Sequence, residues 1–190
     1  MGKRPALAAH NADMNSCSAL IVEGQTVKGK TADGEFAISF NNGKMQTWTY
    51  NGKALIAEGP DFNSYRKVDN DRNFRPTFSN SASVSVTGAL AKSGDNATMS
   101  VKGRANACQY TIDYTFYPDG VVDMKVTFTP SASLARMGLG MQFAAGFEDV
   151  EYYARGPWSN YADRKTGSMI GRYQTTVDDM VDEMLHPQTY

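Results

Sequence analysis

The 190-residue sequence is poor in the residues that bind transition metals or act as nucleophiles. It contains two cysteines, Cys17 and Cys108, and two histidines, His10 and His186. There is no CxxC motif, and neither histidine has a histidine or cysteine partner at the spacing that zinc sites use, so we expect no zinc. The nucleophile motif GxSxG is missing as well. The two thiols are predicted to be buried and free, with a disulfide between them as the alternative.

An excess of charge of one sign is also missing. The sequence holds 19 basic and 20 acidic residues, for a formal net charge of −1. No basic run is interleaved with aromatic residues, so nucleic acid is not expected as a partner. Long apolar runs and cationic amphipathic stretches are absent, so neither a membrane span nor membrane attachment is expected. Residues 1–5 are basic but are followed by no apolar stretch, so they are not a secretory signal, and the compartment stays unknown.

Helical periodicity is scarce too, and its best candidate is a short acidic stretch over residues 176–185. From Leu20 onwards, short β-rich runs alternate with turn residues, which is typical of an all-β sandwich or barrel. Residues 1–19 are small and polar and are predicted to form an arm or linker. Residues 20–190 are then predicted to form one β-domain.

Two β-hairpins are predicted most clearly. In the first, the run 35–40 has alternate apolar residues and is followed by Asn42-Gly43 and a second run, 45–50. Asn-Gly between two such runs predicts a tight turn, because both positions require a positive φ. In the second hairpin, the run 110–116 turns back through a Pro-Asp-Gly sequence into the run 121–128.

Two further segments, 61–73 and 152–167, are predicted to be loops with an unusual density of charged, amide and aromatic residues. A sugar ring presents polar edges that bind carboxylates, amides and guanidinium groups, and an apolar face on which an aromatic ring stacks. The alternative is structural, with the acidic cluster capping turns and the arginines forming ion pairs. The candidate residues for contact with sugar or with a neighbouring domain are Asp69, Asn70, Asp71, Arg155, Trp158, Asn160, Asp163 and Arg164. For Arg155 and Asp163, structural pairing is expected at least as much as ligand binding.

No residues are assigned to catalysis or to a metal. Glycosidases use two carboxyl groups placed across the scissile bond, but none of the glutamates is marked as one of such a pair. Asp69-x-Asp71 resembles the start of a calcium loop but lacks the glycine and terminal glutamate that must follow. The six glutamates are Glu23, Glu35, Glu58, Glu148, Glu151 and Glu183.

The second dense segment carries a family resemblance. Residues 153–167, YARGPWSNYADRKTG, closely resemble the GRGPxENYxDRKxG segment of bacterial β-galactosidases of glycoside hydrolase family 2. Residues 65–71, YRKVDND, are similar to the RAPLDND segment of that family, in the same order along the chain. The resemblance covers residues 20–190. Among the departures, Ser159 stands where the family usually has Glu, and Lys67 stands where it tends to have Pro or a small residue.

The resemblance implies an antiparallel β-supersandwich with the galactose-mutarotase-like fold, the C-terminal or small-chain domain of these enzymes. This domain packs beside a TIM-barrel domain that carries the two catalytic glutamates of the retaining mechanism, so the glutamates are expected outside this chain. The C-terminal strands of the supersandwich are expected to be missing, which would expose a sheet edge and favour self-association. No cofactor is expected in this chain, since the Mg and Na ions of the family lie mostly elsewhere.

The parent enzyme would hydrolyse terminal β-D-galactosides in a bacterial cytoplasm or periplasm, and this chain would be a non-catalytic domain at the rim of its active site. The alternative is a stand-alone carbohydrate-binding module that uses the two dense segments. An aldose-epimerase-like catalyst is a third hypothesis. It needs an acid and a base, commonly a histidine and a glutamate, and His10 and His186 are poorly placed for this role.

Overall fold

Antiparallel β-strands form almost all of the regular structure. The structure is a computed structural model, and it describes residues 10–64, 83–105, 107–134, 137–157 and 165–180. The chain divides into two compact units, the first made of Met1–Arg66 with Asn73–Phe143 and the second of Lys67–Arg72 with Ala144–Tyr190. The all-β antiparallel fold predicted from the sequence is confirmed. None of the helices in the described ranges is long and apolar enough to cross a membrane.

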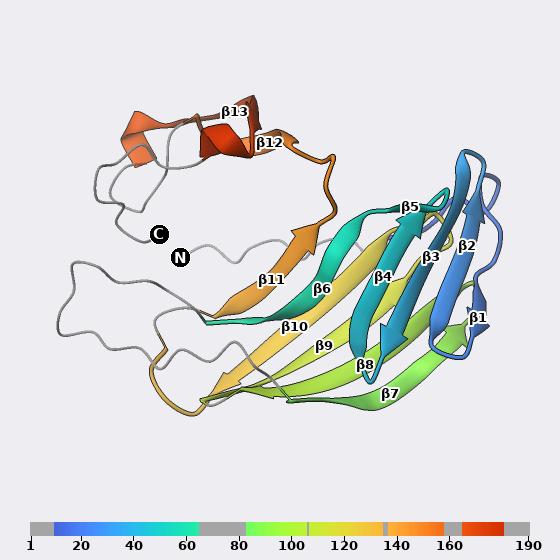
Figure 1. Ribbon diagram of the computed structural model, residues 1–190. Helices are drawn as coiled ribbons and strands as arrows, with labels where there is room; N and C mark the ends of the chain where they lie inside the picture. Colours follow the sequence, from blue (N-terminus) through green and yellow to red (C-terminus); the bar gives the residue numbers. More distant parts are fainter. Residues whose placement is uncertain (1–9, 65–82, 106, 135–136, 158–164, 181–190) are drawn as a thin grey trace. The chain divides into compact units, whose positions relative to one another are not determined.

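The first sheet of the larger unit is a five-stranded meander (Figure 1). Its strands follow the chain order: β1 (Ile21–Glu23), β2 (Thr26–Thr31), β3 (Gly34–Asn41), β4 (Lys44–Tyr50) and β5 (Lys53–Ala54). The turn between β3 and β4 has Asn42 at φ 48° and Gly43 at φ 80°. Asn51 and Gly52 repeat this conformation between β4 and β5, at 48° and 75°. The first predicted hairpin is therefore confirmed, and the Asn-Gly pairs adopt the left-handed backbone that such turns require.

The second sheet has four strands in the order β10-β9-β8-β7. They are β7 (Ser83–Ser93), β8 (Asn96–Ala105), β9 (Cys108–Phe116) and β10 (Val122–Pro130). The pairing of β9 with β10 starts at Phe116 opposite Val122 and ends at Cys108 opposite Pro130. This pairing confirms the second predicted hairpin. A separate two-stranded sheet pairs β6 (Ile56–Asn63) with β11 (Gly138–Phe143).

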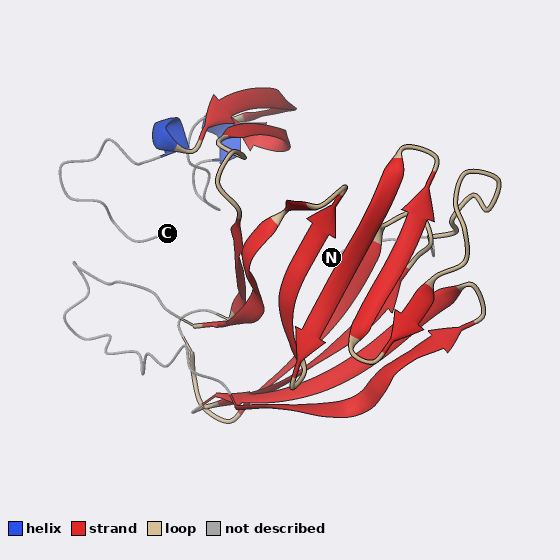
Figure 2. Ribbon diagram, turned by 45° about the vertical axis from the view of Figure 1, so that its right-hand side comes forward, coloured by secondary structure: helices blue, strands red, loops and turns tan. Residues whose placement is uncertain are grey.

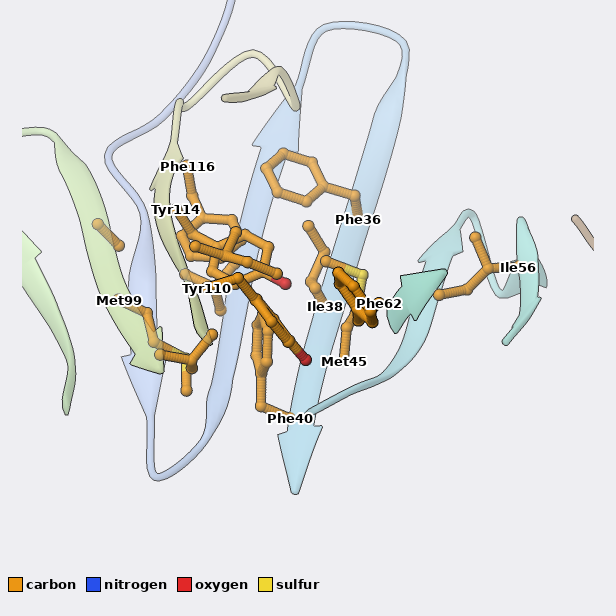
Figure 3. Close-up of a cluster of buried hydrophobic side chains, with 14 of the residues drawn as sticks. Phe36, Ile38, Phe40, Met45, Ile56, Phe62, Met99, Tyr110, Tyr114 and Phe116 are labelled. Carbon is orange, nitrogen blue, oxygen red and sulfur yellow. The ribbon is translucent and has the colours of Figure 1, made fainter. Parts of the chain in front are cut away.

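The core of the larger unit lies between the two main sheets (Figures 2 and 3). Phe40 of β3 meets Tyr114 and Phe116 of β9 edge-on, with ring centroids 5.3 and 5.8 Å apart. Burial alternates along β3 and β9, so that every second side chain faces the opposing sheet. The core also includes Leu20, Val27, Phe36, Ile38, Met45, Ile56, Phe62, Met99, Val101, Tyr110 and Ile112.

Two glycines of the sheets are required by aromatic rings that lie across them. Gly103 of β8 faces Tyr110 of β9, and a Cβ at Gly103 would overlap the Tyr110 ring. Gly29 of β2 faces Phe36 of β3 in the same way. A glycine opposite an aromatic residue lets the ring lie flat over the backbone, and any larger residue would displace the ring from the core.

The described part of the N-terminal segment pairs with the first sheet. Cys17 forms an isolated antiparallel bridge with Thr31, and the amide of Ser18 donates to the carbonyl of Lys30 at 2.9 Å. His10 Nε2 lies 2.7 Å from Asp119 Oδ2, in the turn between β9 and β10, and its ring stands edge-on to Tyr117.

The two cysteines are both free thiols. Cys108 is buried, as predicted, whereas Cys17 is only half-buried. The prediction that both thiols are buried is confirmed for Cys108 and is wrong for Cys17.

The smaller unit contains a β-hairpin of β12 (Asp149–Gly156) and β13 (Met169–Thr176), with the 3-10 turns η1 (Lys165–Gly167) and η2 (Asp178–Met180). The rings of Tyr152 and Tyr173 lie opposite each other on one face, with centroids 5.5 Å apart. The helix predicted over 176–185 appears in the described part as η2 only, and residues 181–185 lie outside the described ranges.

The predicted boundaries of both dense loops were wrong. Residues 61–63 belong to β6, where they pair with β11, and residues 152–156 belong to β12, where they pair with β13. Their polar and aromatic composition indicated loops, but strand pairing with β11 and with β13 extends β6 and β12 into these segments.

Candidate functional site

The structure describes one of the eight predicted site residues, Arg155. The other seven lie outside the described residues: Asp69, Asn70, Asp71, Trp158, Asn160, Asp163 and Arg164. The structure describes the start of the first segment, residues 61–64, and the two ends of the second, residues 152–157 and 165–167.

Arg155 connects the two ends of the second segment. It lies near the end of β12 opposite Ile170, and its Nη1 donates to the backbone carbonyls of Lys165 and Ser168 at 3.0 and 2.9 Å. Hydrogen bonds from a charged guanidinium group are stronger than those between neutral groups. Here one guanidinium nitrogen donates to both carbonyl oxygens. Arg155 therefore holds together the two chain ends between which residues 158–164 run.

Two tyrosines reinforce the same hairpin end. The Tyr152 hydroxyl donates to the carbonyl of Pro157 at 3.3 Å, and the Tyr173 hydroxyl donates to the carbonyl of Met169 at 2.9 Å. Gly156 is buried beneath these rings, where a Cβ would come within 3.0 Å of both tyrosines. The glycine of the Arg-Gly-Pro sequence is thus required by close packing.

An open groove of about 310 Å³ runs along the far end of this hairpin. It is lined by Asp149, Val150, Glu151, Gln174 and Thr175. Glu151 accepts hydrogen bonds from Arg172 Nη1 at 2.7 Å and from Gln174 Nε2 at 3.2 Å. Both partners of the ion pair are largely exposed, so we expect it to contribute little to stability.

At the end of β6, the Asp61 carboxylate accepts three hydrogen bonds. Its Oδ2 accepts from Lys44 Nζ at 2.8 Å, and its Oδ1 accepts from the Phe62 amide at 2.8 Å and from the Tyr110 hydroxyl at 3.2 Å. Burial raises the pKa of Tyr110 well above its usual value, and the neighbouring Asp61 charge raises it further. The hydroxyl therefore stays protonated and acts as a donor.

The sequence did not single out this cluster of Lys44, Asp61 and Tyr110. Asp61 was placed in a predicted loop, and its partners lie 17 and 49 residues away along the chain. No local pattern marks such a contact. The one available signal in the sequence was the position of Asp61 between two apolar residues, Pro60 and Phe62.

A second groove, of about 230 Å³, lies beside this cluster between β4 and β6. Its polar lining residues are Lys44, Gln46, Glu58 and Asp61, and Pro60 and Met45 add apolar surface. Such a lining can hold a small hydroxylated molecule or water through hydrogen bonds.

Several known proteins that are similar to this chain are named β-galactosidases. Residues 30–190 match the family described as β-galactosidase small chain. The chain belongs to this family.

Among curated β-galactosidases, that of Halalkalibacterium halodurans is 25% identical over 175 residues, which cover 81% of this chain and 17% of the relative. The Vibrio cholerae protein is 24% identical over 191 residues, 87% of this chain and 19% of the relative. The Priestia megaterium protein is 35% identical over 80 residues, 40% and 8% respectively. The chain therefore spans less than a fifth of the length of these relatives.

In this member of the β-galactosidase small chain family, the described residues contain no cluster of three or more His, Cys, Asp or Glu side chains that could hold a metal ion. Burial raises the pKa of the Cys108 thiol, which keeps it in the unreactive protonated form. What the described residues do provide is hydrogen bonding at Asp61 and Arg155, close to the two segments that carry the family resemblance.

Proposed function

We propose that this chain is a non-catalytic β-domain of a β-galactosidase that hydrolyses terminal β-D-galactosides. The match to the small-chain family over residues 30–190 carries the proposal, together with the names of the relatives. The two carboxyl groups of the retaining mechanism are supplied by a TIM-barrel domain outside these 190 residues. The chain alone is then inactive and becomes part of a catalyst when it packs beside that domain.

The contribution of the chain lies in the two segments that carry the family resemblance. Asp69, Asn70 and Asp71 in the first segment, and Trp158, Asn160, Asp163 and Arg164 in the second, contact the sugar or the neighbouring barrel domain. Arg155 acts differently, because its Nη1 is engaged by two backbone carbonyls. Its role is to hold the two ends of the second segment together.

The chain itself needs no cofactor in this proposal, and the Mg and Na ions of the parent enzyme bind mostly to other domains. Its partners are a β-galactoside and the barrel domain, and neither nucleic acid nor membrane is among them. Self-association through an exposed sheet edge remains a prediction for the isolated chain.

The test is reconstitution. The chain is produced with and without the polypeptide that carries the rest of the enzyme in the same organism, and each sample is assayed with a chromogenic β-galactoside. We expect the two polypeptides to co-purify and to hydrolyse the substrate together. A barrel-bearing polypeptide that is fully active alone and does not bind this chain would contradict the proposal.

A stand-alone carbohydrate-binding module is the second candidate, and the polar groove between β4 and β6 is the observation that favours it. Calorimetric titration of the isolated chain with galactose separates the two. Binding of galactose by the isolated chain would favour the carbohydrate-binding module. No binding would favour the non-catalytic domain of a β-galactosidase.

A further inference from the structure

Residues 10–18 belong to no named strand, yet they cover part of one edge of β2. The Ser18 amide donates to the carbonyl of Lys30 at 2.9 Å, and Cys17 forms its antiparallel bridge with Thr31. β3 occupies the other edge of β2, and β1 pairs with the earlier part of β2. The N-terminal segment therefore continues the coverage that β1 begins.

A second contact holds the same segment to the opposite sheet. His10 Nε2 lies 2.7 Å from Asp119 Oδ2 in the turn between β9 and β10, and the His10 ring stands edge-on to Tyr117 with centroids 4.8 Å apart. Tyr117 is buried, and a Cβ at Gly120 in this turn would lie 3.5 Å from the Phe36 ring of β3. The segment thus connects the first sheet to the second at one end of the core.

Water reaches these attachments. The side chains of His10 and Asp119 are 36% and 26% exposed, and Cys17 is half-buried. In β9, by contrast, every second residue is buried. Hydrogen bonds at the surface open at a lower free energy than those of core strands, so the segment can detach while the sandwich stays folded.

We propose that residues 10–18 form a strap that opens and closes as one unit, with the contact between His10 and Asp119 as its latch. In the closed state the strap covers the end of β2. In the open state the carbonyl of Lys30 loses its partner, and the end of β2 becomes a free sheet edge to which another strand can add. This inference is independent of the proposed function, because it concerns the larger unit alone.

Cys17 lies in the strap and reports whether it is open. Burial raises the pKa of the Cys17 thiol, and the charges of Asp119, Asp13 and Asp95 raise it further. Opening moves the thiol into water and away from Asp119 and Asp95, so a larger fraction becomes the thiolate that reacts. Cys108 is buried in β9 and serves as the internal reference for unfolding of the whole sandwich.

The test is the rate at which an aromatic disulfide reagent labels the two thiols of the 190-residue chain. His10→Ala removes the latch, and we expect labelling of Cys17 to accelerate about 5-fold, because the loss of one hydrogen bond raises the open fraction by about that factor. His10→Gln keeps a side-chain donor for Asp119 and should restore most of the wild-type protection. Labelling of Cys108 should keep its wild-type rate in both variants.

The matched control is Lys28→Ala. It removes the ion pair between Lys28 Nζ and Glu23 Oε2, which are 2.6 Å apart. This pair joins β1 to β2 at the surface and involves neither His10 nor Asp119. Labelling of Cys17 should therefore stay at the wild-type rate.

Hydrogen exchange measures the same opening without a thiol reagent. The Ala32 amide donates to the carbonyl of Ser16 at 2.8 Å, so its exchange depends on the strap, as does that of the Ser18 amide. In His10→Ala both amides should exchange about 5-fold faster, with exchange in β9 unchanged.

A wild-type rate of Cys17 labelling in His10→Ala would overturn the inference, and so would labelling of Cys108 that accelerates by the same factor. A wild-type chain whose Cys17 reacts as fast as in denaturant would overturn it as well, because the strap would then already be open.

Discussion

Single residues that allow close approach determine how rings pack in the core of the larger unit. Gly103 is the clearest case, because the Tyr110 ring occupies the space that a side chain would need. Gly138 of β11 is the contrasting case, since nothing lies within 4 Å of the position of its missing Cβ. The two glycines both lie in strands, so they separate the effect of packing from that of strand propensity.

Gly103→Ala should therefore destabilise the protein by about 2–4 kcal/mol, because the added methyl group displaces a buried ring. Gly138→Ala should change the free energy of unfolding by less than about 0.5 kcal/mol. Urea denaturation of both variants measures the difference. Equal costs at the two positions would show that the Tyr110 ring moves aside without loss.

Buried tyrosines predict a loss of stability at high pH. Burial raises the pKa of Tyr114 to about 12, and the Asp61 charge adds to the shift. A tyrosine in the unfolded chain ionises near pH 10, so between about pH 10 and 12 the unfolded state releases a proton that the folded state retains. Stability should therefore be unaffected below pH 10 and should fall as the pH rises through this window.

Tyr114→Phe removes the ionisable group and should make this fall shallower, whereas Tyr153→Phe, at a residue 76% exposed, should not. Melting temperatures measured from pH 8 to 12 provide the comparison. Parallel curves for Tyr114→Phe and wild type would mean that other groups cause the alkaline loss.

At the scale of the elements, the two hairpins could be predicted from the local sequence, whereas the ends of two strands could not. The hairpin of β3 and β4 could be predicted because alternating apolar residues and the Asn42-Gly43 turn lie within one short stretch. The strand ends at Asn63 and Gly156 could not, because they depend on pairing with β11 and β13, which lie outside the local sequence. Polar composition suggested loops at both places, and non-local pairing prevailed over it.

The two Asn-Gly turns provide a prediction at this scale. Gly43 and Gly52 have nearly the same φ, but a Cβ at Gly43 would lie 3.1 Å from Val84 and Val101 of the second sheet, while nothing lies within 4 Å at Gly52. Alanine at either site should cost about 1–2 kcal/mol for the left-handed backbone. Gly43→Ala should cost more, because its turn packs on the opposite sheet. Equal midpoints in urea would contradict this packing role.

At the scale of the whole molecule, the family could be inferred from the two motifs. It could not be inferred from the strand pattern, because many unrelated proteins share a β-sandwich. The contacts of the candidate site could be predicted only in part. The positions of the motifs were local information, whereas the bonds of Arg155 to Lys165 and Ser168, and those of Asp61 to Lys44 and Tyr110, depend on the folded chain. Both sets of bonds lie close to the motif segments.

The most direct measurement of the central claim is the rate of β-galactoside hydrolysis by the purified chain, compared at equal molar concentration with its assembly with the barrel-bearing polypeptide. The account predicts no turnover above background for the chain alone and turnover for the assembly. Turnover by the chain alone that survives repeated purification would contradict it, because these 190 residues would then contain a catalytic carboxyl pair.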